Sequence, residues 1–301
     1  MVALATSAGA TPADLHAIWR GALRGVRGLV LWDEDDGIVR PDASLGPRAA
    51  AYAPVFKLLR GEIGRRLVAA EPILDPVAVL YSPVSFRVRW MLDHRPEGNA
   101  WMKRSAETEG GDNAFRVALR DTVAALARMG LRPRFVTPEQ LASGPPPERA
   151  LILPQTLALS EREIAAVRRF AARGGRMIAD VPPGSFDGHG RRRAAAPSIP
   201  ATIAAPADLA KVLTVPPAFR VEAPEGDVDT YLFRSQGRRL LALHRRAPGA
   251  GPEAVPEEVI VHLNGAGARD LVTGQVYGGA ERLSLTLGPV TPAFLEIIPK
   301  R

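Results

Sequence analysis

Pro76-Val-Ala-Val-Leu-Tyr81 opens the stretch of the chain that decides its fold, residues 72–180. Further runs of this kind follow along the stretch: Pro133-Arg-Phe-Val136, Ala150-Leu-Ile-Leu-Pro154 and Gly174-Gly-Arg-Met-Ile-Ala-Asp180. Short runs of Val, Ile, Leu and Ala are typical of strands that are buried on both faces. Such strands form parallel sheets covered by helices, so the stretch predicts an α/β unit.

Helical patterns separate these runs. A helix is predicted over residues 115–129, and a second one begins at Ser160-Glu-Arg-Glu163, where a capping residue is followed by Glu three positions later. Residues 82–86 are predicted as a short loop after the first strand. Because strands and helices alternate, the sheet is predicted to be doubly wound.

The segment between the first strand and the helix at residues 115–129 is long. Residues 86–113 contain Trp90, His94 and Trp101, and they end in a polar run. This length exceeds that of an ordinary strand-to-helix connection, and such insertions are functional or serve association. Trp90, His94 and Trp101 are therefore candidate binding residues.

Residues 11–70 read as helix, strand, loop and helix. Thr11-Pro-Ala-Asp14 carries the signals of a helix start, residues 28–32 form an apolar strand, and residues 46–70 have helical periodicity. One strand cannot bury its own apolar surface. This piece is therefore expected either to dock on another part of the chain or to be the tail of a domain whose beginning is missing.

From residue 218 the apolar period changes to two, with Gly and Pro at the turns, which predicts a small antiparallel β-sandwich. The predicted strands are residues 218–221, 229–234, 239–245, 258–263, 267–271, 282–287 and 293–298.

Composition excludes several classes of function. The chain has 301 residues, no cysteine, and no apolar run near the ~20 residues that span a membrane. The N-terminus lacks the basic region of a signal peptide, so the cytoplasm is expected. The net charge of +7 comes almost wholly from scattered arginines, since only four residues are Lys, and no nucleic-acid motif accompanies it. No nucleic-acid or membrane partner is therefore expected.

No metal or cofactor is expected either. The five histidines have no metal-ligand spacing, so each is predicted to be a surface or locally hydrogen-bonded residue, with His94 the best functional candidate. Ser82 and Ser85 follow the first strand of the sheet, where anions often bind, but no Gly-rich loop accompanies them. G-x-S-x-G, the signature of a hydrolase nucleophile, is absent.

The acidic loop at residues 33–36 follows a buried strand, the position where α/β barrels place active-site residues. Trp32 before it offers a flat surface for a sugar ring. A solvated acidic turn accounts for the same loop, and the sequence alone favours that interpretation.

The order of these segments resembles the C-terminal half of glycoside hydrolase family 42, the β-galactosidase family. The resemblance rests on four features. They are Trp19-Arg-Gly-Ala-Leu-Arg-Gly-Val-Arg-Gly-Leu-Val-Leu-Trp32 for the last helix and eighth strand of a (β/α)8 barrel, Val77-Ala-Val-Leu-Tyr-Ser82 for the first strand of the following domain, the later series Ala150-Leu-Ile-Leu-Pro154, Leu159-Ser160 and Gly174-Gly-Arg-Met-Ile-Ala-Asp180, and the turn Asp270-Leu-Val-Thr-Gly274.

The resemblance implies three parts. Residues 1–70 would be the last β/α unit of the barrel, residues 71–197 a flavodoxin- or glutaminase-like trimerisation domain, and residues 198–301 a β-sandwich. It also implies a trimer, and a galactoside or another sugar as ligand. Trp32 and Glu34 would then line the sugar site of a complete barrel.

In this family the acid/base glutamate follows strand four and the nucleophilic glutamate lies on strand seven. Residues before Thr11 are too few to supply strands one to seven, so no catalytic residue is expected in this chain. The leading hypothesis is a fragment or truncated relative of a β-galactosidase-like enzyme that is not catalytic alone. A non-catalytic oligomerisation or carbohydrate-binding protein is the second hypothesis. An independent enzyme that uses Ser82, Ser85 and His94 is the third.

Overall fold

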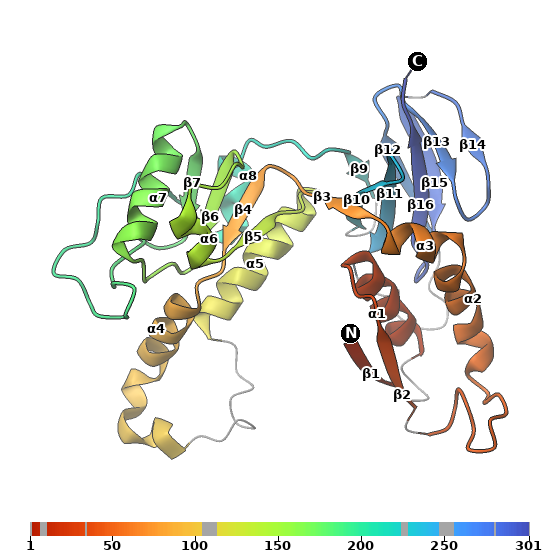
Figure 1. Cartoon of the computed structure of the whole chain (residues 1–301), viewed down its shortest axis with the longest axis horizontal. Coiled ribbons are helices and arrows are strands. Elements are labelled where there is room, and N and C mark those ends of the chain that lie inside the picture. The colour runs from red at the N-terminus through yellow and green to blue at the C-terminus, as the bar shows by residue number, and fades with distance from the viewer. Residues whose placement is uncertain are drawn as a thin grey trace. The chain divides into compact units, whose positions relative to one another are not determined.

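The computed structural model describes residues 2–6, 11–33, 35–103, 113–223, 228–246, 256–279 and 281–300. The chain divides into two compact units (Figure 1). The central unit consists of Leu74–Ala218. The terminal unit combines the two ends of the chain, Met1–Ile73 and Phe219–Arg301.

A five-stranded parallel sheet forms the middle of the central unit, in the order β5-β4-β6-β7-β8. Its strands are β4 (Val77–Leu80), β5 (Arg134–Val136), β6 (Ala150–Leu153), β7 (Arg176–Ala179) and β8 (Thr202–Ile203). All residues of β4 and β6 are buried, which confirms the predicted parallel sheet.

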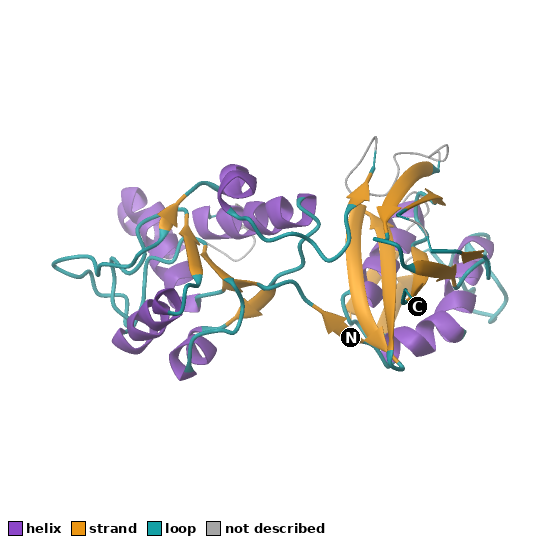
Figure 2. Cartoon of the chain, turned by 90° about the horizontal axis from the view of Figure 1, so that it is seen from above, coloured by secondary structure: helices purple, strands orange, loops and turns teal. Residues whose placement is uncertain are grey.

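Helices lie on both sides of this sheet, above and below it in Figure 2. Ala78 and Leu80 pack in one core with helix α7 (Glu161–Ala172), whereas Val77 and Val79 pack in another with α5 (Ala114–Arg128). Successive residues of a strand point to opposite faces, so β4 must be apolar throughout. The shorter helices are α6 (Pro138–Ser143), α8 (Leu209–Val212) and the 3-10 turn η3 (Pro206–Asp208).

The segment after β4 differs from the prediction. Residues 83–94, expected as a loop and the start of an insertion, form helix α4 (Pro83–His94), and the 3-10 helix η1 (Arg95–Lys103) follows. The Ser82 hydroxyl accepts a hydrogen bond from the Ser85 backbone N–H, and Pro83 takes the first helical position. A helix therefore begins directly after the strand.

The terminal unit begins with a parallel pair of strands, β1 (Val2–Thr6) and β2 (Leu29–Asp33), joined by helix α1 (Thr11–Leu23). The strand at β1 was not predicted. The helix expected over residues 46–70 is two helices, α2 (Ala49–Arg60) and α3 (Glu62–Val68). A Cβ atom at position 64 would clash with the Leu59 carbonyl. Because Gly64 has no side chain, α2 and α3 can approach this closely at the turn that joins them.

Two antiparallel sheets make up the rest of this unit, in the orders β14-β13-β16-β11-β10-β3 and β15-β12-β9. Their strands are β3 (Glu71–Ile73), β9 (Val221–Glu222), β10 (Val228–Ser235), β11 (Arg238–Arg245), β12 (Glu257–His262), β13 (Gly267–Asp270), β14 (Val276–Tyr277), β15 (Arg282–Leu287) and β16 (Ala293–Ile298). The predicted antiparallel strands are confirmed within one or two residues, except that β9 begins later.

The six-stranded sheet is covered on both faces. Leu241 and Leu295 point into the core shared with β12 and β15, whereas Phe294 and Leu240 point into a core shared with the helices. Trp19 of α1 is fully buried there, with its ring 5.5 Å from that of Phe294. The N-terminal piece therefore docks on the antiparallel sheet, which is one of the two expected outcomes.

The terminal unit thus combines residues that precede the central unit with residues that follow it, and the central unit extends to Ala218. The three domains expected at residues 1–70, 71–197 and 198–301 stay a prediction. β8 pairs parallel to β7, so the chain beyond residue 198 continues the parallel sheet before it leaves it.

Candidate functional site

One face of β2 is open. Leu29 and Leu31 pack into the core, whereas Val30 and Trp32 are 44% and 68% exposed. The alternation follows from strand geometry. Trp32 therefore lies on the exposed face of the parallel pair, where the resemblance placed a sugar site. Glu34 lies outside the described residues.

The acidic loop after β2 is held by its own contacts. The Asp33 carboxylate accepts hydrogen bonds from the backbone N–H of Ile38 (2.7 Å) and Val39 (3.1 Å), and Nη2 of Arg48 lies 2.7 Å from it. Arg48 also contacts Asp35. Partial burial raises the pKa of Asp33, but the backbone donors and the Arg48 guanidinium outweigh it and lower that pKa. Asp33 is thus an ionised loop anchor rather than a proton donor.

Strand β1, the neighbour of β2, contains no Asp or Glu. It reads Val-Ala-Leu-Ala-Thr, and residues 1–12 contain neither Asp nor Glu. Since β1 is the parallel neighbour of β2, the strand next to Trp32 offers no carboxylate for acid, base or nucleophilic chemistry.

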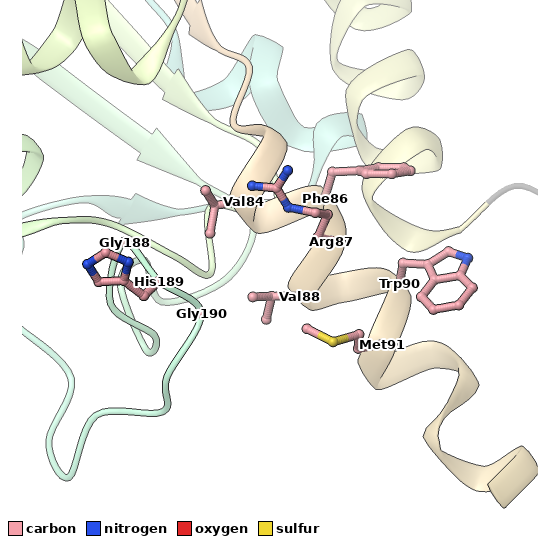
Figure 3. Close-up of a pocket in the computed structure, with 9 residues that line it drawn as sticks. All are labelled: Val84, Phe86, Arg87, Val88, Trp90, Met91, Gly188, His189 and Gly190. Atoms are coloured by element: carbon pink, nitrogen blue, oxygen red, sulfur yellow. The ribbon is translucent and has the colours of Figure 1, made fainter. Parts of the chain in front are cut away.

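A groove of about 650 Å³ lies in the central unit between helix α4 and the loop at residues 188–190. Figure 3 shows Val84, Val88 and Met91 on the side of α4 that faces this loop, with Phe86 and Trp90 pointing away from it. Met91 is 53% exposed. The groove is mainly apolar, with Arg87 and His189 as its charged or titratable lining residues.

Trp90 and His94 are brought together by the turn of α4. Their rings are 4.7 Å apart and tilted by 60°, and Nδ1 of His94 lies 2.8 Å from a carboxylate oxygen of Glu97. Both line a neighbouring hollow of about 520 Å³, together with Arg95 and Asn99. The side chain of Trp101 lies outside the described residues, so its role as a candidate binding residue stays a prediction.

Ser82 and Ser85 are structural. Ser82 caps α4, and the Ser85 hydroxyl donates to the Ala158 carbonyl at 3.2 Å and accepts from the Ala158 N–H at 3.0 Å. Both are buried. His94 lies at the opposite end of α4 from them. The structure therefore does not bring these three residues into one site.

The described residues contain no group of three or more His, Cys, Asp or Glu side chains placed to hold a metal ion. Among the same residues, no helix is both long and apolar enough to cross a lipid bilayer.

No family model matches the sequence, and no curated protein matches it either. Solved structures do match the fold. A catalytic mutant of a GH42 β-galactosidase from G. stearothermophilus is 14% identical, with a TM-score of 0.65 over 95% of this chain and 51% of that chain. An exo-carrageenase of GH42 from Bacteroides ovatus is 13% identical, with a TM-score of 0.58 over 96% of this chain and 39% of that one.

An α-L-fucosidase isoenzyme from Paenibacillus thiaminolyticus is 10% identical, with a TM-score of 0.59 over 97% of this chain and 58% of that one. The chain thus spans about half the length of the solved structures that it matches. At these identities the likeness shows the fold alone. This chain has the fold of part of several glycoside hydrolases.

Proposed function

We propose that this chain is the C-terminal half of a glycoside-hydrolase-like protein and that it does not hydrolyse glycosides by itself. The fold shared with the GH42 structures supports the first part. The shared fold cannot name an activity, because it also occurs in a fucosidase, and function resides in sites rather than folds. The second part therefore depends on the residues present.

Strand β1 is the observation that carries the proposal. If β2 corresponds to the eighth strand of a barrel, its parallel neighbour β1 takes the place of strand seven, which holds the nucleophile in family 42. Retaining hydrolysis needs two carboxyl groups about 5 Å apart. The sequence of β1 contains no carboxylate, so the nucleophile would be missing even if other strands completed the barrel.

The test is hydrolysis of an aryl β-galactoside by purified chain from a host strain without its own β-galactosidase. The expected rate equals that of a mock preparation from the same strain. Hydrolysis that co-purifies with the chain, and exceeds the mock, would contradict the proposal.

We further propose that the central unit assembles the protein into a trimer through the α4 groove. The groove is apolar and open, and an exposed Met such as Met91 is typical of association surfaces. Light scattering should give three times the 32.2 kDa mass of one chain. Met91→Glu should lower this mass, while Leu45→Glu, at a 72% exposed position of the terminal unit, should not. A monomeric wild-type chain would overturn this second proposal and leave the first intact.

Sugar binding is the second candidate function, and the exposed indole of Trp32 together with the Trp90–His94 pair favours it. Galactose titrated into the chain should change the tryptophan fluorescence. Trp32→Phe and Trp90→Phe then identify the site, because only the variant that lacks the binding indole loses the change. No change in the wild-type chain, with galactose near saturation, would remove this candidate.

A further inference from the structure

Two histidines meet inside the terminal unit, where α1 lies on the six-stranded sheet. His16 of α1 is 4% exposed and His244 of β11 is 1% exposed. Their rings stack with centroids 4.3 Å apart and planes inclined by 24°. The sequence predicts that each histidine is a surface or locally hydrogen-bonded residue, and the stacking of these two buried rings is a contact that it does not predict.

Hydrogen bonds fix the protonation of both rings. Nε2 of His16 lies 2.7 Å from the Arg245 carbonyl, and Nε2 of His244 lies 3.0 Å from the Val290 carbonyl. A carbonyl only accepts, so Nε2 carries the hydrogen in each neutral ring, and Nδ1 is the atom that a further proton must reach. Nδ1 of His244 is buried and has no hydrogen-bond partner among the described residues. A proton placed there has no acceptor to stabilise it.

The closest anion on the neighbouring strand is already engaged. Asp229 of β10 stands opposite His244 in the sheet register. Its carboxylate accepts from Nε of Arg246 at 2.9 Å and from the Tyr231 hydroxyl at 3.3 Å, and Nη2 of Arg24 lies 3.9 Å away. Asp229 therefore compensates only part of a charge on the histidine pair.

The remaining charged groups around the pair add little negative charge. Asp14 of α1 accepts a hydrogen bond from the Tyr52 hydroxyl of α2 at 2.8 Å. Arg20, one turn after His16, acts electrostatically against protonation of both rings. The guanidinium of Arg245 points to Glu257 of β12, 3.2 Å away. The arginines around the histidine pair thus oppose its protonation, and the nearby carboxylates are already paired with other side chains.

Both rings resist protonation for these reasons. Burial lowers the pKa of His244 to about 4, helped by the charge that His16 would carry, and burial likewise lowers the pKa of His16. Histidines of the unfolded chain take up protons near pH 6.5. Between these values the unfolded chain binds more protons than the folded one, so acidification weakens the packed state.

We propose that His16 and His244 form an acid-sensitive latch, which holds α1 on the six-stranded sheet while both rings are neutral and releases it when the pair takes up protons. Trp19, one turn along the same helix and fully buried against Phe294, moves with α1. The parallel pair β1–β2 follows, since α1 joins its strands. Release of α1 would therefore also separate β1 and β2, with the exposed face that carries Trp32, from the six-stranded sheet.

A chain with Trp19 as its single tryptophan tests this, with Trp32, Trp90 and Trp101 replaced by Phe. Its emission is expected to shift to longer wavelength as the pH falls from 6.5 towards 4, in a reversible step. In the double variant His16→Gln/His244→Gln, whose side chains still donate to the carbonyls but do not titrate, the midpoint should move down by about one pH unit or more. His189→Gln, at an exposed position of the central unit, is the matched control and should leave the midpoint unchanged.

An unchanged midpoint in the double variant would overturn the latch. If that variant does not fold, NMR titration of the two imidazoles in the wild-type chain decides the question. The latch requires that His244 takes up its proton together with the Trp19 shift, below pH 5.5 or so. Titration of His244 near pH 6.5 with Trp19 still buried would contradict it.

Discussion

The two main sheets of this protein bury polar groups in different ways. Among the described residues of the central unit, the buried polar side chains around the parallel sheet are neutral, such as that of Ser85 in α4, whose hydroxyl bonds to the Ala158 backbone. The six-stranded sheet of the terminal unit buries groups that carry or can take up charge. Glu296 and His244 are 3% and 1% exposed there, and Asp229 is 8% exposed.

This difference determines which unit responds to pH. A buried hydroxyl that is hydrogen-bonded is stable over the whole physiological range, whereas a buried carboxylate or imidazole is stable only in one protonation state. Acidification is therefore expected to weaken the terminal unit, which carries α1 and the open face of β2, more than the central unit.

Removal of a core ring from each unit should give the largest effect. Phe294→Ala and Phe170→Ala each delete a fully buried ring, one from the terminal and one from the central unit, and each should cost about 3 to 5 kcal/mol. Hydrogen exchange read separately on β10–β11 and β6–β7 measures the two units. Equal loss of protection in both units after one substitution would show that the two units unfold together, so their stabilities could not be treated separately.

Glu296→Gln sharpens the contrast in charge. Its carboxylate contacts both Arg66 and Arg238, and burial raises its pKa less than these two guanidinium groups lower it. Because Arg238 is largely exposed, the loss should be about 2 to 3 kcal/mol at pH 7. The stabilisation is present above pH 4.5 and is lost as the pH falls through the lower folded pKa, so wild type and variant should converge in acid. A difference that persists at pH 2 would point to packing instead.

Ser160→Ala removes a neutral cap from the central unit. The Ser160 hydroxyl accepts from the Glu163 N–H, and the Glu163 carboxylate accepts from the Ser160 N–H in return. The expected loss is about 1 kcal/mol by urea unfolding. Thr137→Ala, which removes the same motif from the shorter, exposed helix α6, should cost less. A larger loss for Thr137→Ala than for Ser160→Ala would mean that the burial of the capped helix does not determine how much its cap stabilises the fold.

Asp75→Asn should have the smallest effect. Burial raises the pKa of Asp75, although it accepts a hydrogen bond from the Arg132 N–H at 2.6 Å. Because the pKa of Asp75 is raised in the folded state, its contribution to the stability of the fold increases as the pH falls. The contribution of His244 changes in the opposite direction. Asn keeps one acceptor without charge, so stability at pH 7 should change by less than about 1 kcal/mol, and the small acid dependence should vanish. A large loss at pH 7 would show that the charge itself holds this corner of the unit.

Local signals of the sequence predicted most elements. The apolar run at residues 150–154 became β6, and the capping pattern at Ser160 became the start of α7. Helix α4 was not predicted, although Ser82 and Pro83 are start signals and Val84, Val88 and Met91 recur at helical spacing. This apolar stripe is weak, because only Ser85 and Val88 of the helix are buried and the stripe is short. Trp90 and His94 are predicted from the sequence as candidate binding residues, which stays a prediction, whereas the contact between their rings depends on helix α4.

Most strands, the helix caps and the change of period near residue 218 can be predicted from the sequence, because they depend on neighbours within a few positions. The contacts between residues far apart in the chain follow from the packed fold. This fold joins both ends of the chain into one unit, stacks His16 on His244 and places Glu296 between two arginines. The physical reason is that periodicity records which face of an element is buried, whereas the partner of that face follows from long-range packing.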